Sequence, residues 1–145
     1  MYKTILVATD GSELAAKGVC TAFELARAFG ATVVAVTVTD MIPTGFYGAV
    51  PSPELVERYE TAAEKAAAAI LRSVADAART LGVPCTVKHV PGRRPAEGIS
   101  EAAAEQRCDL IVMASHGRDG VSRLLLGGQA LEVLTLSNVP VMIVR

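Results

Sequence analysis

Short apolar runs rich in β-branched residues alternate with longer amphipathic segments along the chain. The runs predict five strands, at Thr4–Ala8, Thr32–Thr37, Cys85–Val90, Leu110–Ala114 and Val141–Val144. Most of their positions are apolar, without the strict alternation of a strand that has one face in water. The pattern therefore favours strands that are covered on both faces.

The segments between these runs predict four helices, over Ser12–Phe29, Glu54–Leu81, Ala96–Gln106 and Gln129–Ser137. Apolar residues recur at helical spacing in the first two, and a glycine follows each of them, as is typical of a helix end. The expected inner faces comprise Leu14, Val19, Ala22, Leu25, Ala26 and Phe29 in the first helix, and Leu55, Tyr59, Ala62, Ala66, Ile70, Val74, Ala77 and Leu81 in the second.

The alternation of strands and helices predicts one doubly wound α/β domain over residues 1–145. Right-handed crossovers would build a five-stranded parallel sheet with helices on both faces, in three layers. The join from Asp40 to Pro53 is unusually long and contains three prolines, two glycines and two aromatic residues. Such a join is either a lid or contact surface, or an ordered surface flap, and the sequence leaves both open.

The composition narrows the classes of function. With 51% hydrophobic and 20% charged residues, the chain has the balance of a globular core and not of a disordered segment. A net charge of −1 and the absence of tryptophan give no general basis for binding nucleic acid or an anionic membrane. No apolar run approaches the ~20 residues of a transmembrane helix. The chain opens directly into a strand pattern, so a cytoplasmic location without a signal peptide is expected.

Several familiar motifs are absent from the sequence. It contains no G-x-x-x-x-G-K-[ST] phosphate loop and no G-x-G-x-x-G dinucleotide motif. The third and fifth predicted strands do not end in the aspartate and lysine of a two-component receiver domain. Cys20, Cys85 and Cys108 form no CxxC pair, and they are expected to be small apolar residues in or near the core. His89 and His116 are the only histidines and no carboxylate cluster accompanies them, so no metal site is expected.

A glycine-punctuated stretch from Met113 to Gly128 follows the fourth predicted strand. It carries His116, Arg118 and Arg123 against a single acidic residue. A loop between the carboxyl end of a strand and the amino end of a helix is where parallel α/β proteins bind phosphates, through free N–H groups and the helix dipole. The same glycines also suit simple turns, so a purely structural role stays open.

A second candidate, Asp10-Gly11-Ser12-Glu13, follows the first strand directly. Asp10 is expected to contact a ligand at this edge of the sheet, to cap the first helix with Glu13 as its capping-box partner, or both. The two acids would repel phosphate, so this corner suits an uncharged sugar or base. After the third strand, Pro91–Pro95 is expected to be a solvated turn before a helix, in preference to a second positive edge.

Six segments together are similar to the universal stress proteins of the UspA-like family, and the resemblance covers essentially the whole chain. The segments are Ile5–Ser12, Val36–Asp40, Ala103–Met113, Ser115–Arg118, Leu124–Gly127 and Asn138–Arg145. The resemblance implies a parallel sheet of strand order 3-2-1-4-5, as in the adenine-nucleotide alpha-hydrolase-like fold.

Members of this family that bind ATP share a pattern of Gly, two residues, Gly, nine residues, Gly and then Ser or Thr. On this chain the four positions fall on Ala114, Gly117, Gly127 and Gly128, so two match and two depart. Ala114 adds a methyl group where the family's backbone approaches the ligand. Gly128 keeps its N–H but lacks a hydroxyl donor to the terminal phosphates, a loss worth about 1.5–3 kcal/mol or one to two decades of affinity.

The resemblance implies a site for ATP or AMP, with or without Mg²⁺. Ala8, Thr9 and Asp10 would frame the adenosine, Val38 would meet the adenine edge, and Met113 would lie beside the ribose. The other expected contacts are Ala114, Gly117, Arg118, Gly127, Gly128 and Gln129. This degenerate site would keep its adenosine half and lose part of its triphosphate grip, so that AMP and ATP bind more alike.

The resemblance also implies a homodimer in which Val139–Arg145 pairs with its copy about a two-fold axis. The leading interpretation is an adenine-nucleotide-binding regulatory module of the stress response, without catalytic residues and without nucleic-acid or membrane partners. One alternative is a dimeric interaction protein of the same family that binds no nucleotide, which the departures at Ala114 and Gly128 favour. Another is a slow ATP hydrolase, which would lack a phosphate-loop lysine and a clear water-activating residue.

Overall fold

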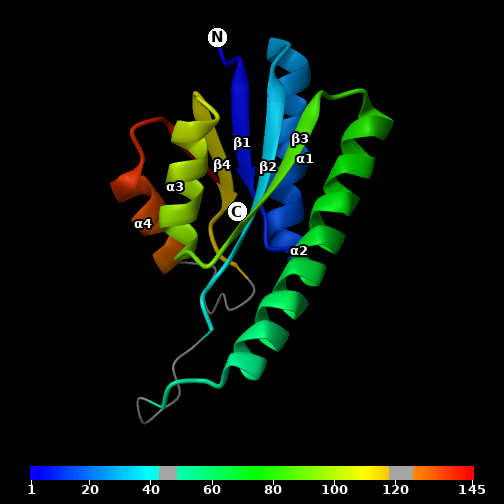
Figure 1. Ribbon diagram of the computed structural model, residues 1–145. Coiled ribbons are helices and arrows are strands. Elements are labelled where there is room, and N and C mark those ends of the chain that lie inside the picture. Colours follow the sequence, from blue (N-terminus) through cyan, green and yellow to red (C-terminus); the bar gives the residue numbers. More distant parts are fainter. Residues whose placement is uncertain (43–48, 118–125) are drawn as a thin grey trace.

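The structure, a computed structural model, describes residues 1–42, 49–117 and 126–145 (Figure 1). The strands are β1 Thr4–Ala8, β2 Thr32–Thr39, β3 Cys85–Pro91, β4 Leu110–Ala114 and β5 Val141–Val144, and the helices are α1 Glu13–Phe29, α2 Pro53–Leu81, α3 Pro95–Glu105 and α4 Gly128–Leu136. Every element predicted from the sequence is present, with its ends within about two residues of the expected bounds. Arg118 and the middle of the join between Asp40 and Pro53 lie outside the described residues.

All five strands are parallel and lie in the order β3-β2-β1-β4-β5. β1 is central: it pairs with β2 over its whole length and with β4 over Ile5–Val7. In Figure 1, α1 and α2 lie on one side of the sheet, and α3 and α4 lie on the other. The predicted doubly wound fold in three layers, and the strand order implied by the family resemblance, are therefore confirmed.

The sheet divides the apolar core in two, because alternate residues of each strand face opposite sides. The half beneath α1 and α2 includes Ile5, Val7, Phe23, Val33, Leu71 and Val112. The half beneath α3 and α4 includes Leu6, Val34, Val36, Ile99, Ile111 and Met113. The central strands are buried on both faces, as their nearly continuous apolar sequences predict.

α1 begins at a different cap from the one expected. Its N-cap is Ser12, whose side-chain oxygen accepts a hydrogen bond from the N–H of Ala15 at 3.1 Å. Asp10 instead accepts from the N–H of Ser12 at 2.9 Å, within the turn between β1 and α1. The prediction that Asp10 caps α1 is wrong because Ser12 is the residue directly before the first helical position, from which a side chain reaches the third helical N–H.

The inner face of α1 also differs from the prediction at its end. Phe23 is buried, whereas Phe29, which was expected on the inner face, is 43% exposed. Phe29 is the last residue of the helix and packs edge-to-face on Tyr2, with 5.4 Å between the ring centroids. The end of the helix is therefore covered by Tyr2, two residues before β1, and not by the sheet.

The inner face of α2 is shifted from the expected one. Its buried residues are Ala67, Leu71, Val74 and Ala78, so of the eight predicted positions only Val74 is fully buried. Five of the predicted positions are exposed, namely Ala62, Ala66 and Ala77, with Leu55 and Leu81 near the two ends of the helix. In Figure 1 the amino-terminal turns of α2 extend past the carboxyl ends of the strands, where no sheet lies beneath them. Over the sheet itself, the buried Ala67, Leu71 and Ala78 each lie one residue beyond a predicted position. No helix in the described ranges, this one included, combines the length and the apolar character needed to cross a bilayer.

Candidate functional site

The carboxyl ends of β1 and β4 form the point at which the strand order reverses. From β1 the chain moves outward to β2 and β3, whereas β4 and β5 continue the sheet on the other side of β1. The connections that leave β1 and β4 therefore run to opposite faces of the sheet and open a crevice between them. The residues that follow these strands, Thr9 to Ser12 and Ser115 to Gly117, overlap the two segments singled out from the sequence, Asp10–Glu13 and Met113–Gly128.

Three of the predicted ligand contacts share one face of the sheet at this edge. Met113 is buried in the half of the core beneath α3 and α4, and Ala8 and Val38 pack against the same half. They come from β4, β1 and β2, which are adjacent strands. The fold therefore brings together the residues expected to meet the adenosine.

Hydrogen bonds fix the segment after β1. The N–H of Thr9 donates to the carbonyl of Val36 at 2.9 Å, and the hydroxyl of Thr37 donates to the carbonyl of Thr9 at 2.9 Å. Gly11, in a left-handed conformation with φ of 78°, donates its N–H to the hydroxyl oxygen of Thr9 at 3.2 Å. Thr9 is itself 7% exposed. The turn that carries Asp10 is therefore held at both of its ends.

Gly117 brings the second segment against this turn. A Cβ atom on Gly117 would lie 2.8 Å from Oδ2 of Asp10, closer than real Cβ atoms approach. The loop after β4 thus passes close to the Asp10 carboxylate, and any larger residue at position 117 would require that carboxylate to move. Two of the residues singled out from separate parts of the sequence are thus neighbours.

Gly127 shows an even closer approach at the start of α4. Its N–H donates to the carbonyl of Ser115 at 2.9 Å, and a Cβ atom on Gly127 would lie 2.5 Å from the same oxygen. Gly127 is the N-cap of α4 but supplies no side-chain hydrogen bond to it. Gly128, the first helical residue, has open space around it, and Gln129 is exposed. Among the described residues, no capping side chain binds the first N–H groups of α4, at the edge where a phosphate is expected.

Ala114, one of the two departures from the ATP-binding pattern, is 8% exposed. By strand alternation it shares the α1 face of β4 with Leu110 and Val112, which belong to the core beneath that helix. A Cβ atom on Gly18 of α1 would lie at an ordinary 3.7 Å from the backbone nitrogen of Ala114. The helix thus packs closely on the end of β4, and the additional methyl group is accommodated there.

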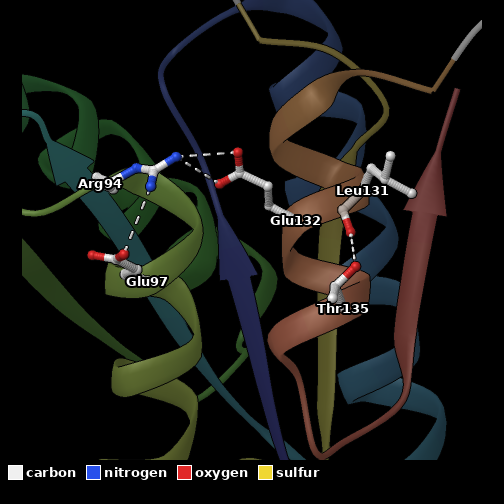
Figure 2. A network of polar contacts seen from close by, with 5 residues as sticks. All are labelled: Arg94, Glu97, Leu131, Glu132 and Thr135. Carbon is white, nitrogen blue, oxygen red and sulfur yellow. Dashed lines mark hydrogen bonds and ion pairs between the residues drawn. The ribbon is translucent and has the colours of Figure 1, made fainter.

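Sequence reasoning missed an ionic link between α3 and α4, which Figure 2 shows. Nη2 of Arg94, the N-cap residue of α3, lies 3.3 and 3.5 Å from the two carboxylate oxygens of Glu132 in α4. Nη1 of Arg94 lies 4.0 Å from Glu97. Arg93 likewise pairs with Glu101 at 3.2 Å. The two arginines of the turn after β3 are therefore paired with carboxylates, and these exposed pairs each contribute at most about 1 kcal/mol.

The cysteines lie away from this site. Burial, together with the adjacent Asp109 carboxylate, raises the pKa of the Cys108 thiol to about 11. Burial also raises the pKa of Cys85. Both residues stand at the amino ends of β3 and β4, opposite to the crevice. Cys20, which was expected in or near the core, is exposed on α1, so that expectation is wrong.

Metal-binding side chains are not gathered in the part of the chain that the structure describes. There, no three His, Cys, Asp or Glu side chains lie close enough together to hold an ion. The Nε2 atom of His89 lies 2.7 Å from the hydroxyl of Thr39, so this ring is engaged within the β2–β3 pair.

Known proteins have a similar sequence and fold. The model of the universal stress protein family matches residues 1–145. A universal stress protein of Thermus aquaticus is 35% identical over 145 residues, which cover the whole of both chains. The solved structure of the protein MJ0577 of Methanocaldococcus jannaschii superposes with a TM-score of 0.85 at 26% identity, covering 99% of this chain and 96% of that one.

A further solved structure, of a universal stress protein in complex with cAMP, matches at 27% identity with a TM-score of 0.74 and covers 99% of this chain and 97% of that one. The matches in sequence and in structure agree over the full described length, including the strands that border the crevice. The chain belongs to the universal stress protein family.

Proposed function

We propose that this protein binds adenine nucleotides in the crevice between β1 and β4 and acts as a regulatory module of the stress response. The observation that carries the proposal is the gathering of Ala8, Val38 and Met113 on one face at the switch point of the sheet. The relative solved in complex with cAMP, which matches almost the whole chain, supports the choice of an adenine nucleotide.

The backbone of Val38 supports a role in reading the base. Val36 turns its carbonyl to β1, where it accepts from Thr9, whereas Thr39 turns its carbonyl to β3, where it accepts from Gly92 at 2.8 Å. Because backbone groups alternate along a strand, the N–H and C=O of Val38 face the β1 side, beyond the last paired residue of β1. One donor beside one acceptor matches the adenine edge, where N1 accepts and the 6-amino group donates.

The phosphates would then lie at the amino end of α4. The N–H groups of the first turn and the positive end of the helix dipole favour an anion there. The open space around Gly128 leaves room for it, but glycine adds no hydroxyl. The proposed site therefore grips the first phosphate by backbone groups and adds little for the second and third, so AMP, ADP and ATP would bind with similar affinity.

The proposed role of this site is regulatory and not catalytic. The Asp10 carboxylate, an acid at the crevice, accepts a hydrogen bond from Ser12 within its own turn. Held in this way, the carboxylate is suited to shaping the site and not to transferring protons during turnover. A Mg²⁺-dependent assay of phosphate release from ATP tests this, and turnover that disappears in Asp10→Asn would favour the slow hydrolase instead.

A homodimer through β5 is part of the same proposal. β5 is an edge strand, paired on one side with β4. Its Met142 is 36% exposed, and the neighbouring α4 exposes Leu131, Leu134 and Leu136. An apolar edge strand invites pairing with a second chain unless it is covered, and a second copy of β5 would cover it.

Calorimetric titration of AMP, ADP and ATP into the wild type and Gly128→Ser tests the nucleotide proposal. We expect similar affinities for the three ligands in the wild type. The serine hydroxyl is expected to add a hydrogen bond to a charged phosphate, raising ATP affinity about ten- to a hundredfold with little effect on AMP. Absence of binding by all three nucleotides would refute the proposal and favour the ligand-free dimeric interaction protein.

A further inference from the structure

Gly98 occupies an unusual position for a glycine, in the first turns of α3. It is buried and helical, and it is not among the glycines with positive φ. Its conformational freedom is therefore not required by the backbone. Glycine inside a helix is unfavourable by about 0.5–1 kcal/mol relative to alanine, so another feature must account for it.

That feature is the close packing of α3 on the end of β2. A Cβ atom on Gly98 would lie 2.8 Å from Cγ1 and 3.0 Å from Cγ2 of Val38, and 3.3 Å from Cγ1 of Val90. Val38 and Val90 are paired neighbours in β2 and β3. Both methyl groups of Val38 thus reach the helix backbone, which fixes a side chain that is already stiff at χ1.

We propose that Gly98 is a positioning residue for adenine recognition, because it admits both methyl groups of Val38 against α3 and so fixes the end of β2. This inference rests on the proposed nucleotide site. At Val38, β2 has no β1 partner left and pairs with β3 alone. The contact with α3 is the packing that holds the N–H and C=O of Val38 at a defined height over the crevice.

The consequence is selectivity for the base. Adenine presents a donor at position 6 and an acceptor at N1, whereas guanine presents an acceptor at position 6 and a donor at N1. A fixed N–H and C=O pair therefore fits one order and repels the other. If the end of β2 shifts or loosens, the pair accommodates either base, and the preference for adenine falls together with affinity.

The test compares AMP and GMP binding by calorimetry in the wild type, Gly98→Ala, Val38→Ala and the double variant Gly98→Ala/Val38→Ala. Gly18→Ala is the matched control, because its Cβ atom would meet only ordinary contacts of 3.7 and 3.8 Å. Circular dichroism selects a temperature at which each variant is folded. Methyl NMR of Val38 reports its packing without any ligand.

We expect Gly98→Ala to weaken AMP binding about fivefold, the equivalent of about 1 kcal/mol, and to lower the ratio of AMP to GMP affinity. Val38→Ala should lower this ratio by leaving a gap beneath α3, so the inference can be tested even if Gly98→Ala does not fold. The double variant should recover much of the ratio, because the new methyl group fills the space of the two removed. Gly18→Ala should retain both the affinity and the ratio.

A Gly98→Ala protein with a lower melting temperature but an unchanged AMP affinity and AMP-to-GMP ratio would overturn the inference and leave the nucleotide site standing. A double variant that recovers none of the lost AMP-to-GMP ratio would also overturn the inference. A wild type that binds no AMP would instead refute the proposed function, and the inference would fail with it. In that case, altered Val38 methyl shifts in Gly98→Ala would show only that the two residues pack together.

Discussion

Gly127 and Gly128 are adjacent in the chain but have different surroundings. A Cβ atom on the first would collide with the Ser115 carbonyl at 2.5 Å, whereas one on the second would meet nothing within 4 Å. The first glycine is thus required by the packing of the loop, and the second by nothing in the described structure. The sequence pattern places both in the same motif and does not separate these roles, because spacing carries no information about which backbone atoms come close.

Gly127→Ala and Gly128→Ala form a matched pair that tests this difference. We expect Gly127→Ala to lower the free energy of unfolding by about 1–3 kcal/mol, because either the loop or α4 must shift. Gly128→Ala should leave stability unchanged or raise it slightly, since alanine favours the first turn of a helix. Urea denaturation measures both. Equal losses in the two variants would contradict the packing at Gly127.

Cys108 makes stability depend on alkaline pH. Its pKa is raised to about 11 in the folded protein, whereas the unfolded thiol ionises near pH 8.5, at about its ordinary pKa. Between these values the unfolded chain releases a proton that the folded protein keeps, so ionisation favours unfolding. The contribution of the protonated Cys108 thiol to the free energy of unfolding is fully present below about pH 8.5 and is lost as the pH rises towards 11.

Unfolding free energies measured from pH 7 to 11 in the wild type, Cys108→Ala and Cys20→Ala check this prediction. We expect Cys108→Ala to show a shallower alkaline fall than the wild type. Cys20→Ala, which alters an exposed thiol, should follow the wild-type profile. Parallel profiles for the wild type and Cys108→Ala would show that this thiol does not titrate differently on folding.

Helix α2 shows what could be predicted from the sequence at the scale of an element, and what could not. Its existence, its length and its end at Gly82, which adopts a left-handed conformation, follow from periodicity and from the glycine signal. Its inner face does not, because alanines lie on every side of the helix and blur the apolar pattern. Only the position of the sheet decides that Ala67 is buried and Ala66 exposed.

Leucine substitutions at these two adjacent alanines test which face of α2 meets the sheet. Ala67, 1% exposed, has no room for a larger side chain, so Ala67→Leu should destabilise the protein by about 1–3 kcal/mol. Ala66→Leu should change stability by less than about 0.5 kcal/mol, as surface substitutions usually do. Thermal unfolding compares them. Loss of stability in Ala66→Leu but not in Ala67→Leu would reverse the assigned face.

At the scale of the whole molecule, the strand–helix alternation was sufficient to predict a parallel sheet in three layers. It also placed both candidate loops at one edge, because parallel strands have all their carboxyl ends there, whereas the strand order that makes β1 and β4 neighbours was implied by the family resemblance. Three contacts could not be predicted: the close approach of Gly117 to Asp10, the pairing of Arg94 with Glu132, and the packing of Gly98 on Val38. Each joins segments far apart in the chain, and their contact depends on how the layers pack.

The proposed dimer can be tested by charge at the free edge of the sheet. In a β5–β5 pair about a two-fold axis, Met142→Glu would place like charges near each other and weaken the association. Leu55→Glu, an equally drastic change at an exposed residue of α2, is the control. We expect sedimentation to give a dimer for the wild type and Leu55→Glu, and a monomer for Met142→Glu. A monomeric wild type at micromolar concentration would contradict the dimer.

The nucleotide site between β1 and β4 is the central claim, and NMR titration of the ¹⁵N-labelled protein with AMP tests it most directly. The account predicts saturable shifts of the amides of Thr9 to Gly11, Val38, Ser115 to Gly117 and Gly127 to Gln129, with amides at the opposite edge near Gly30 and Gly82 unchanged. Spectra that stay the same at millimolar AMP, or shifts confined to another surface, would contradict it.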